Sequence, residues 1–297
     1  MSNKLFTGIM PAMITPFDEN GDLKEQSARR IMQRELNSGI KGFYVNGATG
    51  EGLFLSEATR RKMAETAVDV CRGRGVVINH VGAVDALSAV RLAKHAGEIG
   101  CDAISSLVPN YVTSYTTEQI LDYYKRISDA ASLPVLVYCT GLVGGNPYDF
   151  MEKAIQLDGV IGCKYTMFDY YSMKRITDLN GGDINVINGP DEMLICGLTM
   201  GADGGIGSTY NLMYDWFVEL YDTFRAGNVA RAQEMQAKIN PVITVLLKHG
   251  CIPAIKEAYN LMGYDAGSVA YPGKVFTAEQ SAQLAKDLAE TGFPLEN

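Results

Sequence analysis

One short apolar run of the sequence reads Val160-Ile161-Gly162-Cys163-Lys164-Tyr165-Thr166, with a single lysine near its end. A similar run, Pro134-Val135-Leu136-Val137-Tyr138-Cys139-Thr140, lies 26 positions earlier and carries a tyrosine at the corresponding place. Runs of this length and composition predict buried β-strands. Because burying a charged amine is costly, Lys164 is paired, points outward or is kept for its chemistry. A desolvated amine beside a phenol suits a nucleophile with a proton shuttle.

Runs of this kind recur and alternate with stretches that read as helices. The expected strands cover residues 8–15, 42–45, 76–81, 103–109, 134–140, 160–166, 184–189 and 204–208. The expected helices cover residues 23–36, 56–70, 86–96, 116–131, 147–157, 170–179 and 191–200. Ser56 is expected as an N-cap, and Thr116 with Gln119 as a capping box.

Eight strands, each followed by a helical stretch, fit an α/β fold of the (β/α)8 TIM barrel type. A doubly wound open sheet produces the same alternation. The number of strands favours the barrel, and no G-x-G-x-x-G motif follows the first strand to indicate a dinucleotide site.

The pattern changes after Tyr210, where residues 212–224, 229–248, 252–262 and 278–289 all read as helical. This is more helix than the last barrel unit needs. We therefore expect residues 1–210 to hold the barrel strands and most barrel helices. Residues 211–297 are expected to form the last barrel helix and a C-terminal helical extension. No Pro-, Ser- or Gly-rich linker precedes the extension, so we expect it to pack on the barrel.

Composition narrows the class of protein. The chain has 297 residues, is 47% hydrophobic and carries a formal net charge of -8. It has no basic run that would indicate a nucleic-acid partner and no apolar run long enough to span a membrane. Residues 1–5 lack the long apolar segment that is typical of a secretory leader. The six cysteines form no C-x-x-C pair, and the three histidines are far apart in sequence. We therefore expect a cytoplasmic protein without a metal site.

In a TIM barrel the functional residues lie at the carboxyl ends of the strands and in the loops that follow. By strict alternation Gly162, Lys164 and Thr166 share one face of their strand, so an inward-facing lysine would reach the barrel mouth. The other polar or loop residues predicted at this end are Ala48, Thr49, Tyr111, Tyr138, Gly189, Asp191 and Ser208.

Each candidate taken singly also has an ordinary structural interpretation. A lysine at a strand end can extend into water or pair with a carboxylate, and a strand tyrosine such as Tyr138 is usually a core aromatic. The glycines of residues 47–52 fit a turn before a helix, although the N–H groups of such a turn also suit a carboxylate ligand. Asp191 and Glu192 complement a helix dipole. All these candidates are expected at the same end of one barrel, and this joint occurrence favours a functional site.

Several segments together resemble the dihydrodipicolinate synthase/N-acetylneuraminate lyase family. They are Gly47-Ala48-Thr49-Gly50-Glu51, the Tyr138 strand, Gly162-Cys163-Lys164 and residues 201–211. The resemblance extends over essentially the whole chain, including Pro253-Ala254-Ile255-Lys256 near its end. It implies a class I pyruvate-dependent aldolase on a (β/α)8 barrel with a C-terminal helical extension, usually a homotetramer built as a dimer of dimers.

The resemblance also implies roles for individual residues. Lys164 would form a Schiff base with the keto carbon of a 2-oxo acid such as pyruvate, without metal or cofactor. Tyr138 would relay a proton to or from the substrate hydroxyl. Thr49, beside Ala48, would hold the carboxylate with the adjacent N–H groups. Tyr111 resembles a tyrosine that crosses a tight dimer interface to assist the relay.

Within the family, residues 188–192 and 201–211 are most similar to the N-acetylneuraminate lyase branch. This implies cleavage of a 2-oxo-3-deoxy sugar acid, N-acetylneuraminate in the first place, to pyruvate and an aldehyde sugar. The dihydrodipicolinate synthases carry an arginine a few residues beyond the strand-five tyrosine, and residues 139–145 contain none. The sugar-binding residues implied by the branch are Thr166, Gly189, Asp191, Glu192 and Ser208.

Two departures from the lyase pattern leave alternatives open. The lyases have a serine where this chain has Ala48, and residues 165–168 are bulkier and more apolar than expected after the lysine. One alternative is an aldolase for another 2-oxo acid, of the 2-keto-3-deoxygluconate type, or a true dihydrodipicolinate synthase. The other is a non-catalytic sensor of sugars or 2-oxo acids, disfavoured because binding alone needs no imine.

Overall fold

The structure is a computed structural model that describes residues 4–108, 115–143 and 145–295. Its strands form one parallel sheet in the order β1-β8-β7-β6-β5-β4-β3-β2. All eight expected strands are present. Their bounds are β1 (Gly8–Pro11), β2 (Gly42–Val45), β3 (Val76–His80), β4 (Ala103–Ser106), β5 (Val135–Cys139), β6 (Val160–Tyr165), β7 (Asn185–Asn188) and β8 (Gly204–Gly207).

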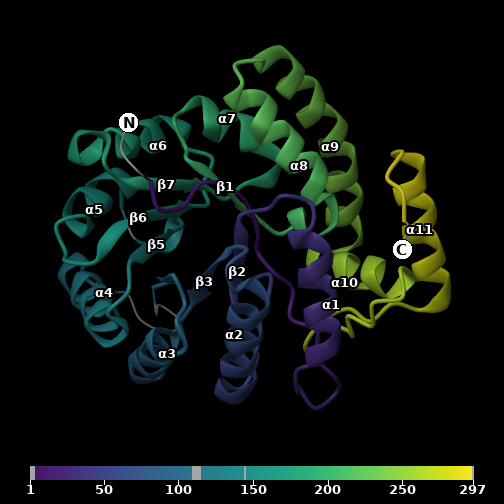
Figure 1. The fold of residues 1–297 in the computed structure, drawn as a ribbon, viewed down its shortest axis with the longest axis horizontal. Coiled ribbons are helices and arrows are strands. Elements are labelled where there is room, and N and C mark those ends of the chain that lie inside the picture. The colour runs from purple at the N-terminus through teal and green to yellow at the C-terminus, as the bar shows by residue number, and fades with distance from the viewer. Residues whose placement is uncertain (1–3, 109–114, 144, 296–297) are drawn as a thin grey trace.

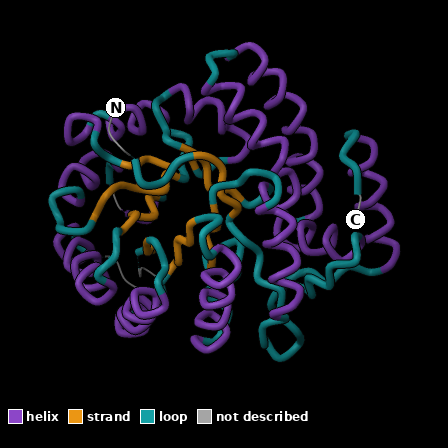
Figure 2. The backbone as a smooth tube through the Cα atoms, in the orientation of Figure 1, coloured by secondary structure: helices purple, strands orange, loops and turns teal. Residues whose placement is uncertain are grey.

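The sheet closes on itself. Just beyond β1, Ala12 forms a parallel bridge with Tyr44 of β2, and the N–H of Met13 donates to the Tyr44 carbonyl at 2.9 Å. The strands lie in the middle of the molecule with the helices around them (Figure 2). The expected (β/α)8 TIM barrel is therefore confirmed, and the doubly wound open sheet is excluded.

Helices follow the strands in turn, and the last ones lie to one side of the barrel (Figure 1). In the extension, α9 packs against α8, and α10 and α11 pack against α9. No helix in the described ranges has the length and apolar character to cross a bilayer. The bounds are α1 (Glu25–Leu36), α2 (Glu57–Cys71), α3 (Ala86–Ile99), α4 (Thr117–Ala131), α5 (Pro147–Ala154), α6 (Tyr170–Thr177), α7 (Leu194–Thr199), α8 (Tyr210–Arg225), α9 (Val229–His249), α10 (Cys251–Leu261) and α11 (Ala278–Glu290).

Some element boundaries differ from the predicted ones. The first strand was expected to reach Thr15, but β1 ends at Pro11. The N–H groups of Ala12 and Met13 still donate to carbonyls of neighbouring strands, whereas that of Ile14 donates to a side-chain atom, Oδ1 of Asn211, at 3.1 Å. The expected helix 191–200 is divided into a 3-10 turn over Asp191–Met193 and α7, because Met193 has non-helical backbone angles, with φ -126° and ψ 23°.

The barrel encloses one apolar cluster and its helices cover another. Tyr44 and Tyr138 belong to the inner cluster, together with Leu136. Cys163 and Tyr165, on either side of Lys164, belong to the outer cluster between sheet and helices. Because side chains alternate along a strand, Lys164 faces the barrel interior, as predicted.

The capping box at the start of α4 gives a stability prediction. The Thr116 hydroxyl accepts from the N–H of Gln119 at 3.3 Å, and the Gln119 side chain accepts from the N–H of Thr116 at 2.9 Å. Thr116→Ala should lower the free energy of unfolding by about 1 kcal/mol. Thr117→Ala, the same change one position along, should alter it by less than about 0.5 kcal/mol. Urea unfolding of both variants measures the difference, and equal effects would contradict it.

Candidate active site

The register of two neighbouring strands brings Lys164 and Tyr138 together. The two residues are Cα partners in the parallel pairing of β5 with β6. The Lys164 side chain is buried, with 4% relative exposure. Its Nζ lies 3.9 Å from the ring centroid of Tyr138 and 5.3 Å from that of Tyr44. The aromatic faces stabilise the ammonium by cation–π attraction, so the amine is held inside the barrel mouth.

Lys164 fits neither of its ordinary interpretations. It does not extend into water, since it is buried. Among the described residues no ion pair involves its amine, whose hydrogen bond goes to Oγ1 of Thr166 at 3.4 Å. Buried lysines without a carboxylate partner are rare, because desolvation of the charge is not repaid. This geometry therefore favours a chemical role.

The phenol of Tyr138 is affected by the same neighbours. Burial by itself disfavours the phenolate, but the positive charge of Lys164 and the hydrogen-bonding groups of Lys164 and Thr166 outweigh it, so the pKa of Tyr138 lies below its ordinary value. A phenol with a lowered pKa passes a proton more readily near neutral pH. The pair therefore combines an amine nucleophile with an acid–base group.

A second part of the site lies where the β2 loop meets the end of β8. Oγ1 of Thr49 and Oγ of Ser208 are 2.7 Å apart. The loop around Thr49 is a tight turn, in which the N–H of Glu51 donates to the Ala48 carbonyl at 3.0 Å. Thr49 is buried, whereas Ala48 is exposed. The Thr49 hydroxyl and the turn N–H groups make this corner suitable for a carboxylate.

The loop after β7 contacts Thr166, the residue whose hydroxyl lies beside the Lys164 amine. The N–H of Gly189 donates to the Tyr165 carbonyl at 2.7 Å. A Cβ at position 189 would lie 2.0 Å from Oγ1 of Thr166, so a glycine is required for the two loops to approach this closely. Gly189 thus lies against Thr166, whose hydroxyl is 3.4 Å from the Lys164 amine.

Asp191 connects the same loop to β8. Its Oδ2 accepts from the N–H and from Oγ1 of Thr209, both at 2.7 Å. Its Oδ1 faces Gly207, where a Cβ would lie 1.7 Å away. Burial raises the pKa of Asp191 to about 6, although the Thr209 hydrogen bonds oppose the shift.

Glu192 follows in the 3-10 turn, and its carbonyl accepts from Nδ2 of Asn240 on α9 at 3.3 Å.

Two interior residues of the site were not predicted. The ring of Tyr44 lies edge-on to that of Tyr138, with centroids 6.1 Å apart. The ring of His80 also lies edge-on to that of Tyr138, with centroids 6.1 Å apart. Nε2 of His80 accepts from the N–H of Leu107 at 3.0 Å. The proton of the imidazole is therefore on Nδ1, which donates to the Asn46 carbonyl at 3.1 Å. Burial, with a contribution from Arg60, lowers the pKa of His80 to about 3, so the imidazole is neutral. Alternation along β2 could have identified Tyr44.

The structure therefore brings Lys164, Tyr138, Thr166 and Gly189 together and joins Thr49 to Ser208. The predicted Tyr111 lies in residues 109–114, outside the described residues. Within the described ranges, no group of three or more His, Cys, Asp or Glu side chains could hold a metal ion.

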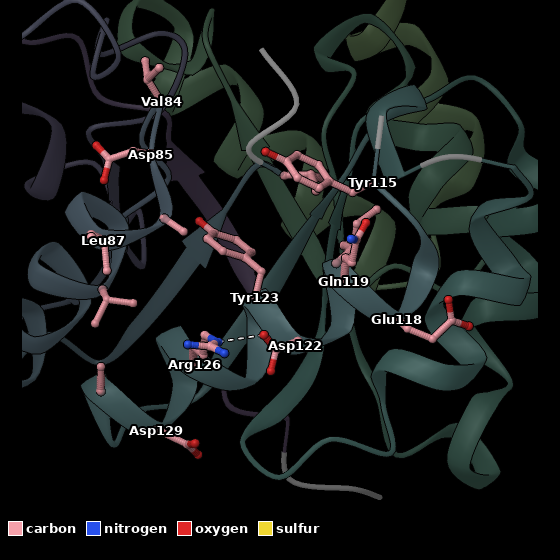
Figure 3. A pocket seen from close by; sticks show the side chains of 15 residues that line it. Val84, Asp85, Leu87, Tyr115, Glu118, Gln119, Asp122, Tyr123, Arg126 and Asp129 are labelled. Atoms are coloured by element: carbon pink, nitrogen blue, oxygen red, sulfur yellow. Dashed lines mark hydrogen bonds and ion pairs between the residues drawn. The ribbon is translucent and has the colours of Figure 1, made fainter. Parts of the chain in front are cut away.

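A groove of about 1020 Å³ lies away from this site, between α3 and α4. Figure 3 shows Tyr123 near its middle, Leu87 on one wall and Tyr115 on the other. None of the predicted site residues that the structure describes lines it. The groove is therefore separate from the amine and phenol.

The fold and site define a TIM barrel that carries a buried lysine beside a tyrosine at the carboxyl ends of adjacent strands. The chain belongs to the dihydrodipicolinate synthetase family, whose model matches residues 5–291.

Individual relatives are similar along nearly the full length. The N-acetylneuraminate lyase of Salmonella paratyphi B is 36% identical over 262 residues, which cover 87% of this chain and 88% of that protein. The structure of Proteus mirabilis N-acetylneuraminate lyase superposes with a TM-score of 0.92 at 28% identity, covering 98% of this chain and 100% of that one. A catalytic lysine mutant of Ruminococcus gnavus sialic acid aldolase superposes with a TM-score of 0.90 at 25% identity, covering 97% and 98%.

The raised pKa of Asp191 predicts how stability varies with pH. Between about pH 4 and pH 6 the unfolded chain loses this proton while the folded chain keeps it, so the Asp191 contribution to stability falls as pH rises. Relative to Asp191→Asn, the wild-type free energy of unfolding should therefore fall by up to about 3 kcal/mol between pH 4 and pH 7. Urea unfolding at several pH values measures this difference, with the exposed Asp149→Asn as the matched control. A difference that is independent of pH would contradict the prediction.

Proposed function

We propose that this protein is a Schiff-base (class I) aldolase that reversibly cleaves N-acetylneuraminate to pyruvate and an aldehyde sugar. The observation that carries the proposal is the buried Lys164 amine, stacked on Tyr138 with no carboxylate partner among the described residues. The family and the relatives named N-acetylneuraminate lyase support the substrate. The aldolase described as a catalytic lysine mutant supports a lysine-dependent reaction.

In the first step the neutral amine of Lys164 attacks the keto carbon of the open-chain sugar acid. The Tyr138 phenol gives its proton to the departing hydroxyl, which leaves as water, so that a protonated imine on Nζ and a Tyr138 phenolate result. The imine is an electron sink. Tyr138 then removes the proton from the hydroxyl on carbon 4, and the bond between carbons 3 and 4 breaks. Its electron pair moves into the imine to give an enamine, and the hydroxyl carbon leaves as the aldehyde.

Release of pyruvate completes the cycle. Tyr138 passes the proton taken from the hydroxyl to carbon 3 of the enamine, which regenerates the protonated imine and the Tyr138 phenolate. Water then attacks the imine carbon and gives up a proton to the Tyr138 phenolate, which frees the Lys164 amine and pyruvate and restores the phenol. Throughout, Thr49 and the turn N–H groups hold the carboxylate, while Thr166, Gly189, Asp191, Glu192 and Ser208 bind the hydroxyls of the sugar chain.

A different 2-oxo acid is the second candidate substrate. Ala48 supplies no hydroxyl at the carboxylate corner, and Phe168, just beyond the lysine strand, is 68% exposed. Both features alter the surroundings of the substrate chain. Dihydrodipicolinate synthesis is less well supported, because residues 139–143 offer no basic side chain to a second carboxylate.

The oligomer and the compartment are part of the same proposal. We propose a homotetramer, a dimer of dimers, in which a second copy covers the groove between α3 and α4. The exposed apolar side chains of Val84, Leu87 and Tyr115 line that groove and support this arrangement. The six free cysteines, four of them buried, support a reducing compartment, the cytoplasm.

The amine and the phenol make different predictions for turnover. Lys164→Ala should abolish release of pyruvate from N-acetylneuraminate, because no imine can form. Tyr138→Phe should lower kcat by about 10²- to 10⁴-fold while leaving imine formation possible. Coupling to lactate dehydrogenase measures both, with 2-keto-3-deoxygluconate offered in parallel. Normal turnover by Lys164→Ala would refute the mechanism, and activity on 2-keto-3-deoxygluconate alone would move the substrate to the second candidate.

The alanine at the carboxylate corner makes a separate prediction. The exposed Ala48 side chain leaves room for a hydroxyl. One added hydrogen bond to the carboxylate, of about 0.5–1.5 kcal/mol, should raise kcat/KM of Ala48→Ser for N-acetylneuraminate about 2- to 10-fold. The melting temperature should stay unchanged. Identical kinetics on every sugar acid tested would remove position 48 from the account of specificity.

A further inference from the structure

A buried ion pair joins the carboxylate turn to the C-terminal helical region. Nζ of Lys256, on α10, lies 2.7 Å from Oε1 of Glu51, in the turn that follows β2. The side chains are only 1% and 7% exposed. Lys256 is thus a second buried lysine, but unlike Lys164 it has a carboxylate partner.

Further contacts fix both members of the pair. Oε2 of Glu51 accepts from the N–H of Ala270 at 2.7 Å. Nζ of Lys256 donates to the Ser268 carbonyl at 2.8 Å and lies 3.7 Å from the centroid of the Phe17 ring. The Glu51 carboxylate therefore contacts the extension at two points, on α10 and on the segment that follows it.

The turn that carries Glu51 also carries Thr49. Glu51 has φ 57°, a left-handed conformation that costs a non-glycine residue free energy. A Cβ at Gly50 would lie 2.9 Å from the Met13 carbonyl, so the turn is packed closely against the segment after β1. A strained conformation persists only where surrounding contacts hold it, and the contacts of the Glu51 carboxylate come from the extension.

We propose that Glu51 and Lys256 are positioning residues for the 2-oxo acid carboxylate: the pair holds the turn so that Thr49 and its neighbouring N–H groups face the substrate. The C-terminal helical region thereby sets the affinity of the barrel for its 2-oxo acid. This inference rests on the proposed function, since it assumes that the turn binds a carboxylate.

The choice of a charged pair has a physical reason. Burial lowers the pKa of Lys256 to about 8, although Glu51 opposes the shift, so the pair is retained against a desolvation penalty. A buried pair adds little to stability compared with apolar packing. The bond from the Ala270 N–H to the carboxylate and the bond from Lys256 to the Ser268 carbonyl are directional, however, and fix the orientation of the two side chains. Directional contacts suit a turn whose N–H groups must point at a ligand.

The test compares variants of the pair with a matched control in the same helical region. Glu51→Gln/Lys256→Met removes both charges together, so no unpaired charge stays buried. Glu51→Gln alone is the milder change if the double variant does not fold. Asp287→Asn is the control, because Asp287 pairs with His249 and Lys248 between α11 and α9, outside the turn.

Three quantities are measured for each variant: the melting temperature, kcat and KM for N-acetylneuraminate, and the pyruvate concentration that half-saturates inactivation by borohydride. Loss of one or two well-oriented hydrogen bonds to the carboxylate corresponds to about a 10-fold weaker affinity. The double variant should therefore show KM and pyruvate half-saturation both raised about 10-fold, with kcat within about twofold of wild type. Glu51→Gln should shift both in the same direction by less. Asp287→Asn should lower the melting temperature and leave both unchanged.

The outcomes separate this inference from the function on which it rests. If wild type is inactivated by borohydride with pyruvate and both Glu51 variants keep its half-saturation, the inference is overturned and the proposed function stands. An equal rise in Asp287→Asn would also overturn it, since the effect would then follow from general loosening of the extension. Failure of wild type to be inactivated would overturn the proposed function and the inference together.

Discussion

The structure depends on one constraint, a lysine amine buried in the mouth of a barrel with no carboxylate partner in the described part of the chain. Lys164 faces inward because its neighbours Cys163 and Tyr165 pack outward against the helices. An isolated buried charge costs several kcal/mol. The ring of Tyr138 and the hydroxyl of Thr166 offset part of this cost. Forming an imine with a bound ketone is the chemistry that such an amine can carry out.

The rest of the site follows from the same arrangement of strands. β5 and β6 supply the phenol and the amine at one level of the barrel. The turn after β2 meets the end of β8 through Thr49 and Ser208, on the side that we assign to the carboxylate. Behind the phenol, His80 is neutral and fixes the ends of β2 and β4 through its two ring nitrogens. Polar contacts between loops thus hold these residues at the same end of the barrel.

Much of the fold could be predicted from the sequence, because barrel strands and helix caps have local signals. The matching positions of Tyr138 and Lys164 in their two runs became partners in the sheet. The pairing of Glu51 with Lys256 could not be predicted, because it depends on how the extension packs on the barrel. The same holds for His80, whose role comes from contacts with residues of two other strands. The division of residues 191–200 at Met193 reflects backbone angles that composition does not reveal.

The lysine that forms the Schiff base can be identified by trapping pyruvate on it. The protein is incubated with pyruvate and borohydride, digested, and its peptides are analysed by mass spectrometry. The account predicts one modified peptide, carrying on Lys164 the mass of pyruvate less one water plus two hydrogens. Lys256 is the internal comparison, as the other buried lysine of the described residues. An adduct on Lys256 or on a surface lysine in place of Lys164, or no adduct, would contradict the account.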